Sequence, residues 1–158
     1  MKITLVHVDD LNEMEITIRH NNPSEAARIK RLLEASQFKL EVKDSSAIDT
    51  TEVLMIDPHQ IYYFESVDDK VFCYLANETY ETNYKLYELE EILSQLPFLR
   101  VSKGVIVNIS MIKSFRSALS GRLICTLNND EQIVISRMYV KLLKEKLGVN
   151  RGSNNESN

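Results

Sequence analysis

The order of apolar and polar residues along the chain predicts a protein built mainly of short strands. Runs of four to six residues with alternating or continuous apolar positions are typical of strands, and turn-forming residues separate several of them. The clearest turns are predicted at 68–69 and 128–130, and a polar loop is predicted over 44–52. The predicted strands cover 3–8, 15–18, 38–42, 53–56, 61–66, 70–75, 79–82, 99–101, 105–107, 112–115, 122–127 and 132–135.

Apolar residues at helical spacing predict three helices among these strands. Asn22 is a suitable cap for the first helix, Pro97 ends the second, and Ser136 and Gly148 bracket the third. The acidic residues on the second helix, such as Glu90, are interpreted as a solvated face. The predicted helices cover 23–35, 85–95 and 137–147. Together these elements predict a mostly β fold of the α+β class with a few helices.

Composition supports a folded protein and argues against several other classes. The chain has 158 residues, 44% of them hydrophobic, which is enough for a core. The sequence contains neither a membrane-spanning apolar run nor a signal-peptide pattern at its start, so a cytoplasmic location is expected. Cys73 and Cys125 lie in strand-like runs and are expected to be buried free thiols.

Charge is distributed unevenly along the chain, and this changes the picture given by the net charge of −4. Residues 52–95 carry 2 basic and 10 acidic side chains, a net charge of −8. Residues 96–147 carry 9 basic and 3 acidic side chains, a net charge of +6. A partner responds to the local field more than to the total, so the basic segment is a candidate surface for a polyanion.

No pattern in the sequence indicates an enzyme. The chain lacks a phosphate-binding loop, a dinucleotide fingerprint and a nucleophile motif, and its three histidines are dispersed. No catalytic residue, metal site, cofactor or small-molecule substrate is therefore expected. Asp9, Asp10 and Asp57 each follow a strand-like run, as the acids of a phosphorylated receiver domain do. A β-rich segment begins at Ile61 instead of the alternating architecture of a receiver, so these acids are interpreted as turn residues.

Several basic residues of the chain fall at predicted turns and at a helix start. Lys70 lies at a hairpin turn, Lys103 in the loop that follows Arg100 and Ser102, and Arg137 at the start of the last helix. Arg and Lys side chains pair with guanine edges in the major groove and with phosphates. Basic residues at turns are more often simply solvated, so the residue pattern alone leaves DNA binding as one alternative.

Three segments together resemble the LytTR family of DNA-binding domains. They are IYYFESVDDKVFCYL (Ile61–Leu75), YELEEILSQLPFLRVSKGVIVNISMI (Tyr87–Ile112) and LNNDEQIVISRMYVKLLKEKL (Leu127–Leu147). Their order and spacing extend over about ninety residues, so the combination is far more specific than any one piece. The resemblance implies a β fold that places loops into successive major grooves.

The resemblance also implies which residues meet DNA. Lys70, Lys103 and Arg137 fall at base-reading or phosphate-binding positions, and Arg100 and Ser102 share the Lys103 loop as phosphate contacts. Lys141 is not given by the resemblance: from its place one helical turn beyond Arg137 it is expected to meet the phosphate backbone, or to be solvated. Asn108 is expected to pin the local backbone rather than touch DNA. Gly104 departs from the family, which often has a serine there, and this weakens the carry-over at that position.

The expected organisation has three parts: a small αβ extension over 1–50 for pairing or partner contact, a LytTR-type domain over 51–149, and a disordered tail over 150–158. The expected function is a response-regulator-like transcriptional regulator without a receiver. It would bind double-stranded DNA with repeated half-sites as a homodimer, with a membrane-bound inhibitory protein as a candidate partner. The alternative is a protein–protein adaptor or ligand sensor on a LytTR-like scaffold. Salt-sensitive DNA binding separates the two.

Overall fold

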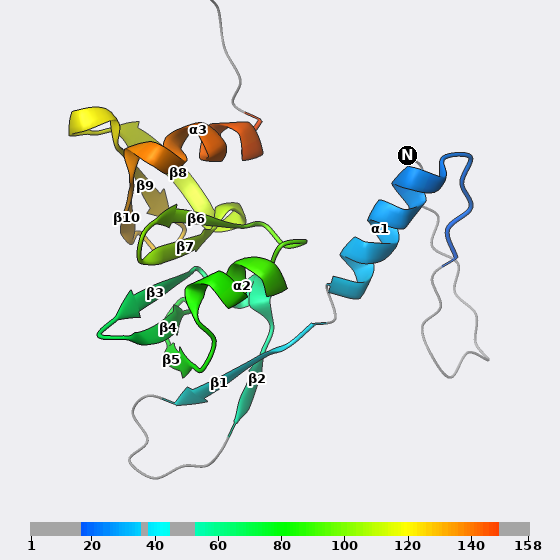
Figure 1. Ribbon diagram of the computed structural model, residues 1–158, viewed down its shortest axis with the longest axis horizontal. Coiled ribbons are helices and arrows are strands. Elements are labelled where there is room, and N and C mark those ends of the chain that lie inside the picture. The colour runs from blue at the N-terminus through cyan, green and yellow to red at the C-terminus, as the bar shows by residue number, and fades with distance from the viewer. Residues whose placement is uncertain (1–16, 36–37, 45–52, 149–158) are drawn as a thin grey trace, which may run out of the picture.

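Two antiparallel sheets form the body of the protein. The computed structural model describes residues 17–35, 38–44 and 53–148, and in these parts the strands pair as one seven-stranded and one three-stranded sheet (Figure 1). The large sheet has the order β2-β1-β5-β4-β3-β7-β6 and the small sheet the order β10-β9-β8. The strands are β1 (Leu40–Asp44), β2 (Leu54–Ile56), β3 (Tyr63–Val67), β4 (Lys70–Tyr74), β5 (Thr79–Thr82), β6 (Phe98–Ser102), β7 (Val105–Asn108), β8 (Ile112–Ser117), β9 (Leu123–Leu127) and β10 (Gln132–Ile135).

The three predicted helices are all present. They are α1 (Pro23–Ala35), α2 (Leu86–Ile92) and α3 (Arg137–Lys146), with short 3₁₀ turns at η1 (Pro58–Gln60), η2 (Ile109–Met111) and η3 (Leu119–Gly121). Asn22 caps α1 as predicted, because its Oδ1 accepts a hydrogen bond of 3.2 Å from the Glu25 N–H. Helix α2 is shorter than predicted, since the chain tightens after Ile92 into turns that bury Leu93 and Leu96.

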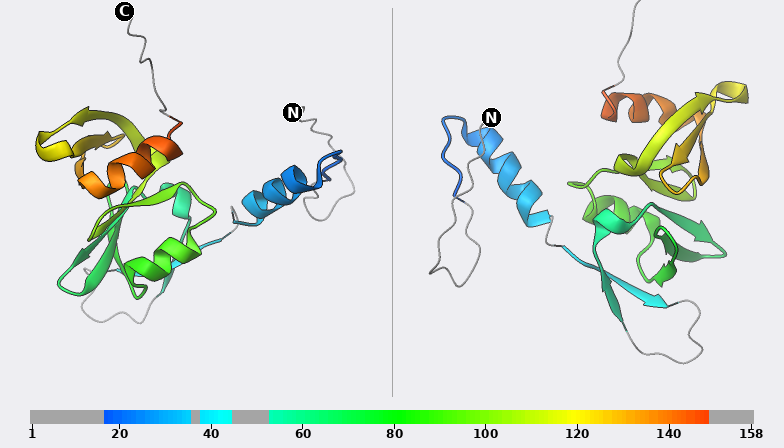
Figure 2. Two further views of the ribbon diagram at one scale, coloured as in Figure 1. Left: turned by 45° about the horizontal axis from the view of Figure 1, so that its top comes forward. Right: turned by 180° about the vertical axis from the view of Figure 1, so that it is seen from behind.

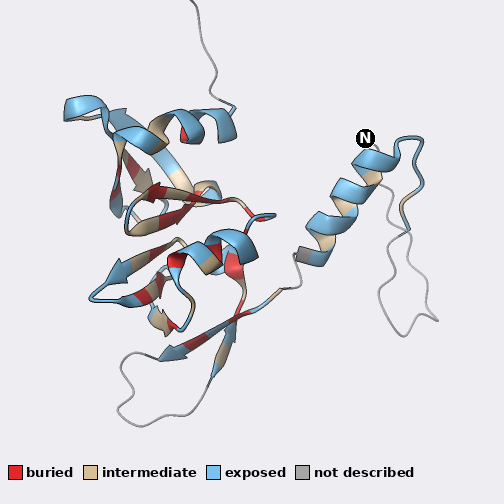
Figure 3. Ribbon diagram, in the orientation of Figure 1, coloured by how far each residue is buried: buried red, intermediate tan, exposed pale blue. Residues whose placement is uncertain are grey.

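The body is stabilised by two hydrophobic cores that share strands β6 and β7. Phe98 and Ile106 point into the core between the large sheet and α2. Their neighbours Leu99 and Val107 point into the other core, which also holds residues of the small sheet and α3. Figure 3 shows the buried positions concentrated on the two sheets and on α2, while the buried residue of α3 is Leu143. Strands β6 and β7 are thus packed on both faces, which fixes the turn between them.

Strand β1 belongs to the large sheet although it precedes the predicted domain boundary near residue 50. It pairs with β2 and with β5, and Leu40 and Val42 are 0% and 1% exposed. Helix α1, in contrast, lies away from both sheets in Figures 1 and 2. The division at residue 50 stays a prediction, but the packed unit includes residues on both sides of it.

The turns follow the chemistry of their residues. Asp68 and Asp69 both have positive φ, 49° and 63°, which is the conformation that a two-residue hairpin turn requires. Asp130, at φ 67°, closes the turn predicted at 128–130. Several other predictions lie outside the described residues: the strand over 3–8, most of that over 15–18, most of the loop over 44–52 and the disordered tail. Asp44, the first residue of that predicted loop, instead ends β1. Thr17 and Ile18 are not in a strand.

The mostly β, α+β fold is confirmed, and so is the interpretation of the cysteines. Cys73 and Cys125 are free and buried, and burial raises the pKa of the Cys73 thiol to about 12. Neither thiol is therefore in the reactive thiolate form near neutral pH. Of the helices in the described parts of the chain, none is long and apolar enough to cross a membrane.

Candidate functional site

Three elements that carry predicted DNA contacts are joined by hydrogen bonds of the main chain. The Ser66 N–H, at the end of β3, donates to the Gly104 carbonyl in the β6–β7 turn over 2.8 Å. The Ser136 N–H, just before α3, donates to the Val101 carbonyl in β6, also over 2.8 Å. The β3–β4 hairpin, the β6–β7 turn and the start of α3 therefore lie side by side, with the β6–β7 turn in the middle.

The β6–β7 turn presents Lys103 to solvent. The register between the strands shifts between Arg100 and Ser102, so that Val101 is an extra, fully buried residue at a β-bulge. The Gly104 N–H donates to Ser102 Oγ over 3.3 Å, which leaves the Ser102 hydroxyl proton available to another acceptor. The Lys103 side chain is exposed and has no ion pair within the described chain. The turn thus offers one unpaired cation on an ordered backbone.

Arg100 is bound within the protein. Its guanidinium donates to the Ser102 carbonyl over 3.0 Å, to the Lys103 carbonyl, and to Glu90 Oε2 over 2.8 Å. Glu90 lies on the exposed face of α2, as predicted, and its carboxylate also pairs with Arg100. A phosphate contact by Arg100 stays a prediction. In the structure its side chain instead joins Glu90 to the backbone of the β6–β7 turn.

Arg137 extends from the start of α3 over the β8–β9 hairpin. Gly121, in the turn of that hairpin, has φ +73°, and a Cβ built on it would lie 3.3 Å from Arg137 Cδ. The absence of a side chain at Gly121 lets the Arg137 stem lie against the turn. The arginine itself is exposed and has no ion pair within the residues that the structure describes. Ser136 occupies the N-cap position as predicted, although its side chain makes no capping bond.

The two remaining predicted contacts, Lys70 and Lys141, differ in whether they form an ion pair within the described chain. Lys70 lies directly after the hairpin turn, and its Nζ donates to Glu81 Oε2 over 3.0 Å. Lys141 is exposed on α3, on the turn after Arg137, and makes no ion pair in the described chain. Exposed ion pairs are worth about 0–1 kcal/mol, so Lys70 can exchange Glu81 for another anion at little cost.

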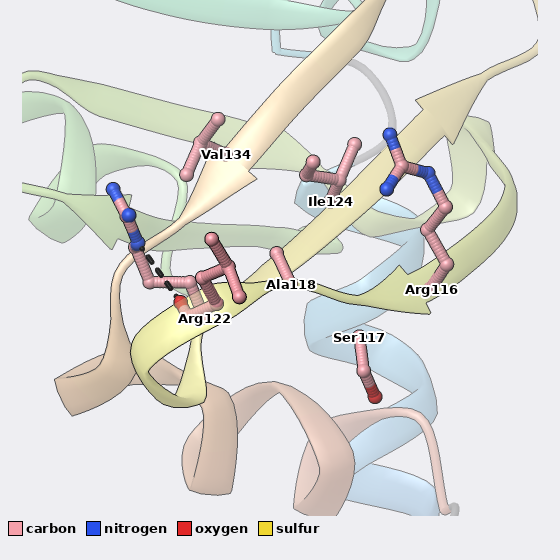
Figure 4. Close-up of a pocket in the computed structure, with 7 residues that line it drawn as sticks. Arg116, Ser117, Ala118, Arg122, Ile124 and Val134 are labelled. Carbon is pink, nitrogen blue, oxygen red and sulfur yellow. Dashed lines mark hydrogen bonds between the residues drawn. The ribbon is translucent and has the colours of Figure 1, made fainter.

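The outer face of the small sheet extends the basic surface. A shallow hollow of about 520 Å³ lies there, with Arg116 and Arg122 on either side of Ile124 and Val134 (Figure 4). Arg122 also donates from its Nε to the Leu119 carbonyl over 3.3 Å. The hairpin that carries Arg122 is the one that lies against Arg137. Three of the nine basic residues of 96–147, Arg116, Arg122 and Arg137, thus lie on or against the β8–β9 hairpin.

Asn108 has the supporting role that was predicted for it. The side chain is fully buried, its Nδ2 donates to the Ile61 carbonyl over 2.9 Å, and its Oδ1 accepts from the Ser110 N–H over 3.1 Å. It therefore ties β7 to the segment before β3 and has no access to a ligand.

Asp57 is a turn residue, as predicted. Its Oδ1 accepts from the His59 N–H over 2.9 Å and so caps η1, and Lys39 lies 3.3 Å from its Oδ2. These hydrogen bonds, led by that from the His59 backbone, hold the pKa of Asp57 below its ordinary value. Asp9 and Asp10 lie outside the described residues. Within the described ranges, no group of three His, Cys, Asp or Glu side chains could hold a metal ion.

Sequence reasoning found the elements of the site but missed residues that support them. Gly121 and Arg122 are not singled out by the sequence, and nothing in it pairs Glu90 with Arg100. The structure places Glu90 against Arg100, Gly121 against Arg137, and Arg122 directly after Gly121 beside the hollow of the small sheet. The available signals were a glycine between two predicted strands and the local excess of basic residues.

Comparisons with known proteins agree on one family. Residues 51–148 match the family profile described as the LytTr DNA-binding domain. A stretch of 97 residues is 30% identical to the sensory transduction protein LytT of Bacillus cereus, and covers 61% of this chain and 39% of that protein. A stretch of 98 residues is 30% identical to a Staphylococcus aureus protein described as an uncharacterized HTH-type transcriptional regulator, and covers 62% of this chain and 66% of that protein.

The fold has a solved relative. A LytTr DNA-binding domain from Bacillus cereus superposes with a TM-score of 0.63 at 22% sequence identity, and covers 71% of this chain and 98% of that domain. The chain spans about two-fifths of the length of LytT and just under two-thirds of the staphylococcal protein. The similarity thus covers only a part of these relatives.

Proposed function

The chain belongs to the LytTR family of DNA-binding domains, and from that premise we propose that it regulates transcription by reading a specific DNA sequence with three neighbouring elements. These elements are the β3–β4 hairpin, the β6–β7 turn and the start of α3. The observation that carries the proposal is the pair of main-chain hydrogen bonds, Ser66 to Gly104 and Ser136 to Val101, that join the three elements. A rigid arrangement of this kind lets side chains enter neighbouring grooves in a fixed register.

The proposed contacts divide by chemistry. Arg137 has the planar fork that pairs with the O6 and N7 atoms of guanine, and Lys103 reaches out from an ordered turn. The Ser102 hydroxyl and Lys141 are suited to phosphates, since they offer a donor without bidentate geometry. Lys70 joins them by exchanging Glu81 for the DNA backbone.

The most direct test is to select binding sites from random DNA with the purified protein and then to titrate variants on the selected duplex. We expect Lys103→Ala to lower specific affinity by about 1–2 kcal/mol and to reduce the specific-to-random ratio. Lys141→Ala should weaken specific and random binding alike, with a salt slope lower by about one unit. A protein that enriches no sequence and shows no salt-sensitive binding would support the adaptor or ligand-sensor function instead.

We further propose that the regulator binds repeated half-sites as a pair and that the N-terminal segment contributes to pairing. Helix α1 lies away from both sheets (Figure 2). Leu32 on this helix is 42% exposed. A cytoplasmic location and a membrane-bound inhibitory partner complete the proposal; both rest on the sequence and the family alone.

The pairing role predicts a specific defect when α1 is removed. A chain that begins at Phe38 keeps β1 and both cores, so it should bind a single half-site as tightly as the full chain. On two half-sites it should lose cooperativity, about ten-fold or more in apparent affinity, because the second binding event is no longer linked to the first. Gel-shift titrations on one-site and two-site duplexes measure both quantities. Equal cooperativity in the two chains would exclude pairing through this segment.

A further inference from the structure

Arg100 connects helix α2 to the turn that carries Lys103. One end of its guanidinium is bound to Glu90 Oε2 at 2.8 Å, and the other donors bind the carbonyls of Ser102 and Lys103. The Arg100 side chain is only 20% exposed, although its partner Glu90 is 43% exposed. The two carbonyls belong to successive residues of the turn, which makes the guanidinium a clamp on its backbone.

The rest of the turn is held by single contacts. The Gly104 N–H reaches Ser102 Oγ, and the Gly104 carbonyl receives the Ser66 N–H. Between Ser102 and Gly104, the Lys103 carbonyl has Arg100 as its partner. The direction of the Lys103 side chain therefore depends on Arg100, and the direction of Arg100 depends on Glu90.

We propose that Glu90 and Arg100 are positioning residues that hold the β6–β7 turn in its DNA-reading conformation, so that an acidic side chain of α2 increases sequence-specific affinity. The inference rests on the proposed function, because it assigns the turn to the DNA. Neither residue needs to touch DNA: Glu90 orients the guanidinium, and the guanidinium orders the Lys103 backbone. The three acids of α2 thereby have separate roles, since Glu88 accepts from the Lys85 N–H at 2.7 Å, Glu90 binds Arg100, and Glu91 is exposed.

Neutralisation of Glu90 is expected to change the specific affinity for DNA in the direction opposite to that of simple charge attraction. Removal of a negative charge from a DNA-binding protein, considered by itself, strengthens its attraction to a polyanion. If Glu90 positions the turn, its neutralisation has the opposite effect on the specific site. A structural role in stability alone moves specific and random binding together, whereas a positioning role lowers their ratio.

The test compares Glu90→Gln with Glu91→Gln, which removes the same charge from the next residue of the helix. We expect Glu90→Gln to weaken specific binding about three- to ten-fold with random binding unchanged or slightly stronger, since a charged hydrogen bond is replaced by a weaker one. Glu91→Gln should leave the specific-to-random ratio unchanged. Unfolding midpoints within about 3 °C of the wild type verify that both variants fold. Stronger specific binding by Glu90→Gln would overturn the proposal and identify Arg100 as a phosphate contact that Glu90 restrains.

Two further measurements separate the clamp from the proposed function. Arg100→Lys keeps the charge but cannot bind two carbonyls and a carboxylate in one plane, so it should lower the specific-to-random ratio while the salt slope is retained. In the free protein, amide hydrogen exchange at Gly104 should be about three- to ten-fold faster in Glu90→Gln than in the wild type and unchanged in Glu91→Gln. Unchanged exchange in Glu90→Gln would disprove the clamp whether or not the protein binds DNA. Faster exchange in a protein without specific binding would retain the clamp and reject the proposed function.

Discussion

Replacement of Arg137 with alanine is expected to reduce affinity for the best DNA site by about 1–3 kcal/mol and to relax the sequence preference at one position. The side chain begins at the first residue of α3 and its stem lies along Gly121, so the β8–β9 hairpin restricts the directions of that stem before DNA is bound. A preorganised donor pair loses little entropy on binding, which is why this substitution has the largest effect among the predicted contacts. Titrations on the selected duplex and on single-base variants of it measure both quantities.

Arg137→Lys is the matched control, because it keeps the charge and removes the fork. It should bind random DNA as the wild type does, with the same salt slope, and lose most of the discrimination. The unfolding midpoint should change little in either variant, since the side chain is exposed. If both variants keep the wild-type preference at every base position, Arg137 does not read a base.

Replacement of Leu40 with alanine is expected to destabilise the whole folded unit by about 2–5 kcal/mol, although this residue precedes the segment that matches the family. Leu40 is 0% exposed in the core beneath α2, and among the described residues its strand is the one that pairs with β2. Urea unfolding followed by circular dichroism measures the loss. A chain that begins at Thr51 removes Leu40 and Val42 together and should be largely unfolded or insoluble, since domains of this size are stable by only about 5–15 kcal/mol.

Glu41→Ala is the control for position, since Glu41 is exposed between the two buried residues of the same strand. It should change the free energy of unfolding by no more than about 0.5 kcal/mol. If the chain that begins at Thr51 unfolds at the same urea concentration as the full chain, β1 is an accessory strand and the boundary near residue 50 is a true domain boundary.

Local signals explain which parts of the fold could be predicted from the sequence. Strands β5 and β10 were predicted to the residue, because alternation and turn residues act over a few positions. The place of β1 could not be predicted, since its partner β5 lies beyond a polar segment that resembles a linker. Side-chain pairing such as that of Glu90 with Arg100 depends on how α2 approaches β6, and no spacing in the sequence encodes it.

In the candidate site, too, some residues could be predicted from sequence motifs, whereas contacts between distant segments could not. The positions of Lys103 and Arg137 followed from motifs whose order is specific to the family. The engagement of Arg100 did not, because the same arginine is compatible with a phosphate contact or with an internal clamp until its neighbours are known. Likewise, the contact between Gly121 and Arg137 joins two segments that only the folded chain brings together.

Because the two cores share strands β6 and β7, the whole folded unit is expected to unfold together when the protein is heated. Phe98 and Ile106 face one core, while Leu99 and Val107 face the other. If one core unfolds, the other therefore loses the packing of the strands that they share. Melting should then occur as one transition, and the Lys103 turn should stay ordered until the transition begins. Warming would accordingly empty an operator over a narrow temperature interval, through the unfolded fraction, and bound DNA would shift that interval upward by mass action.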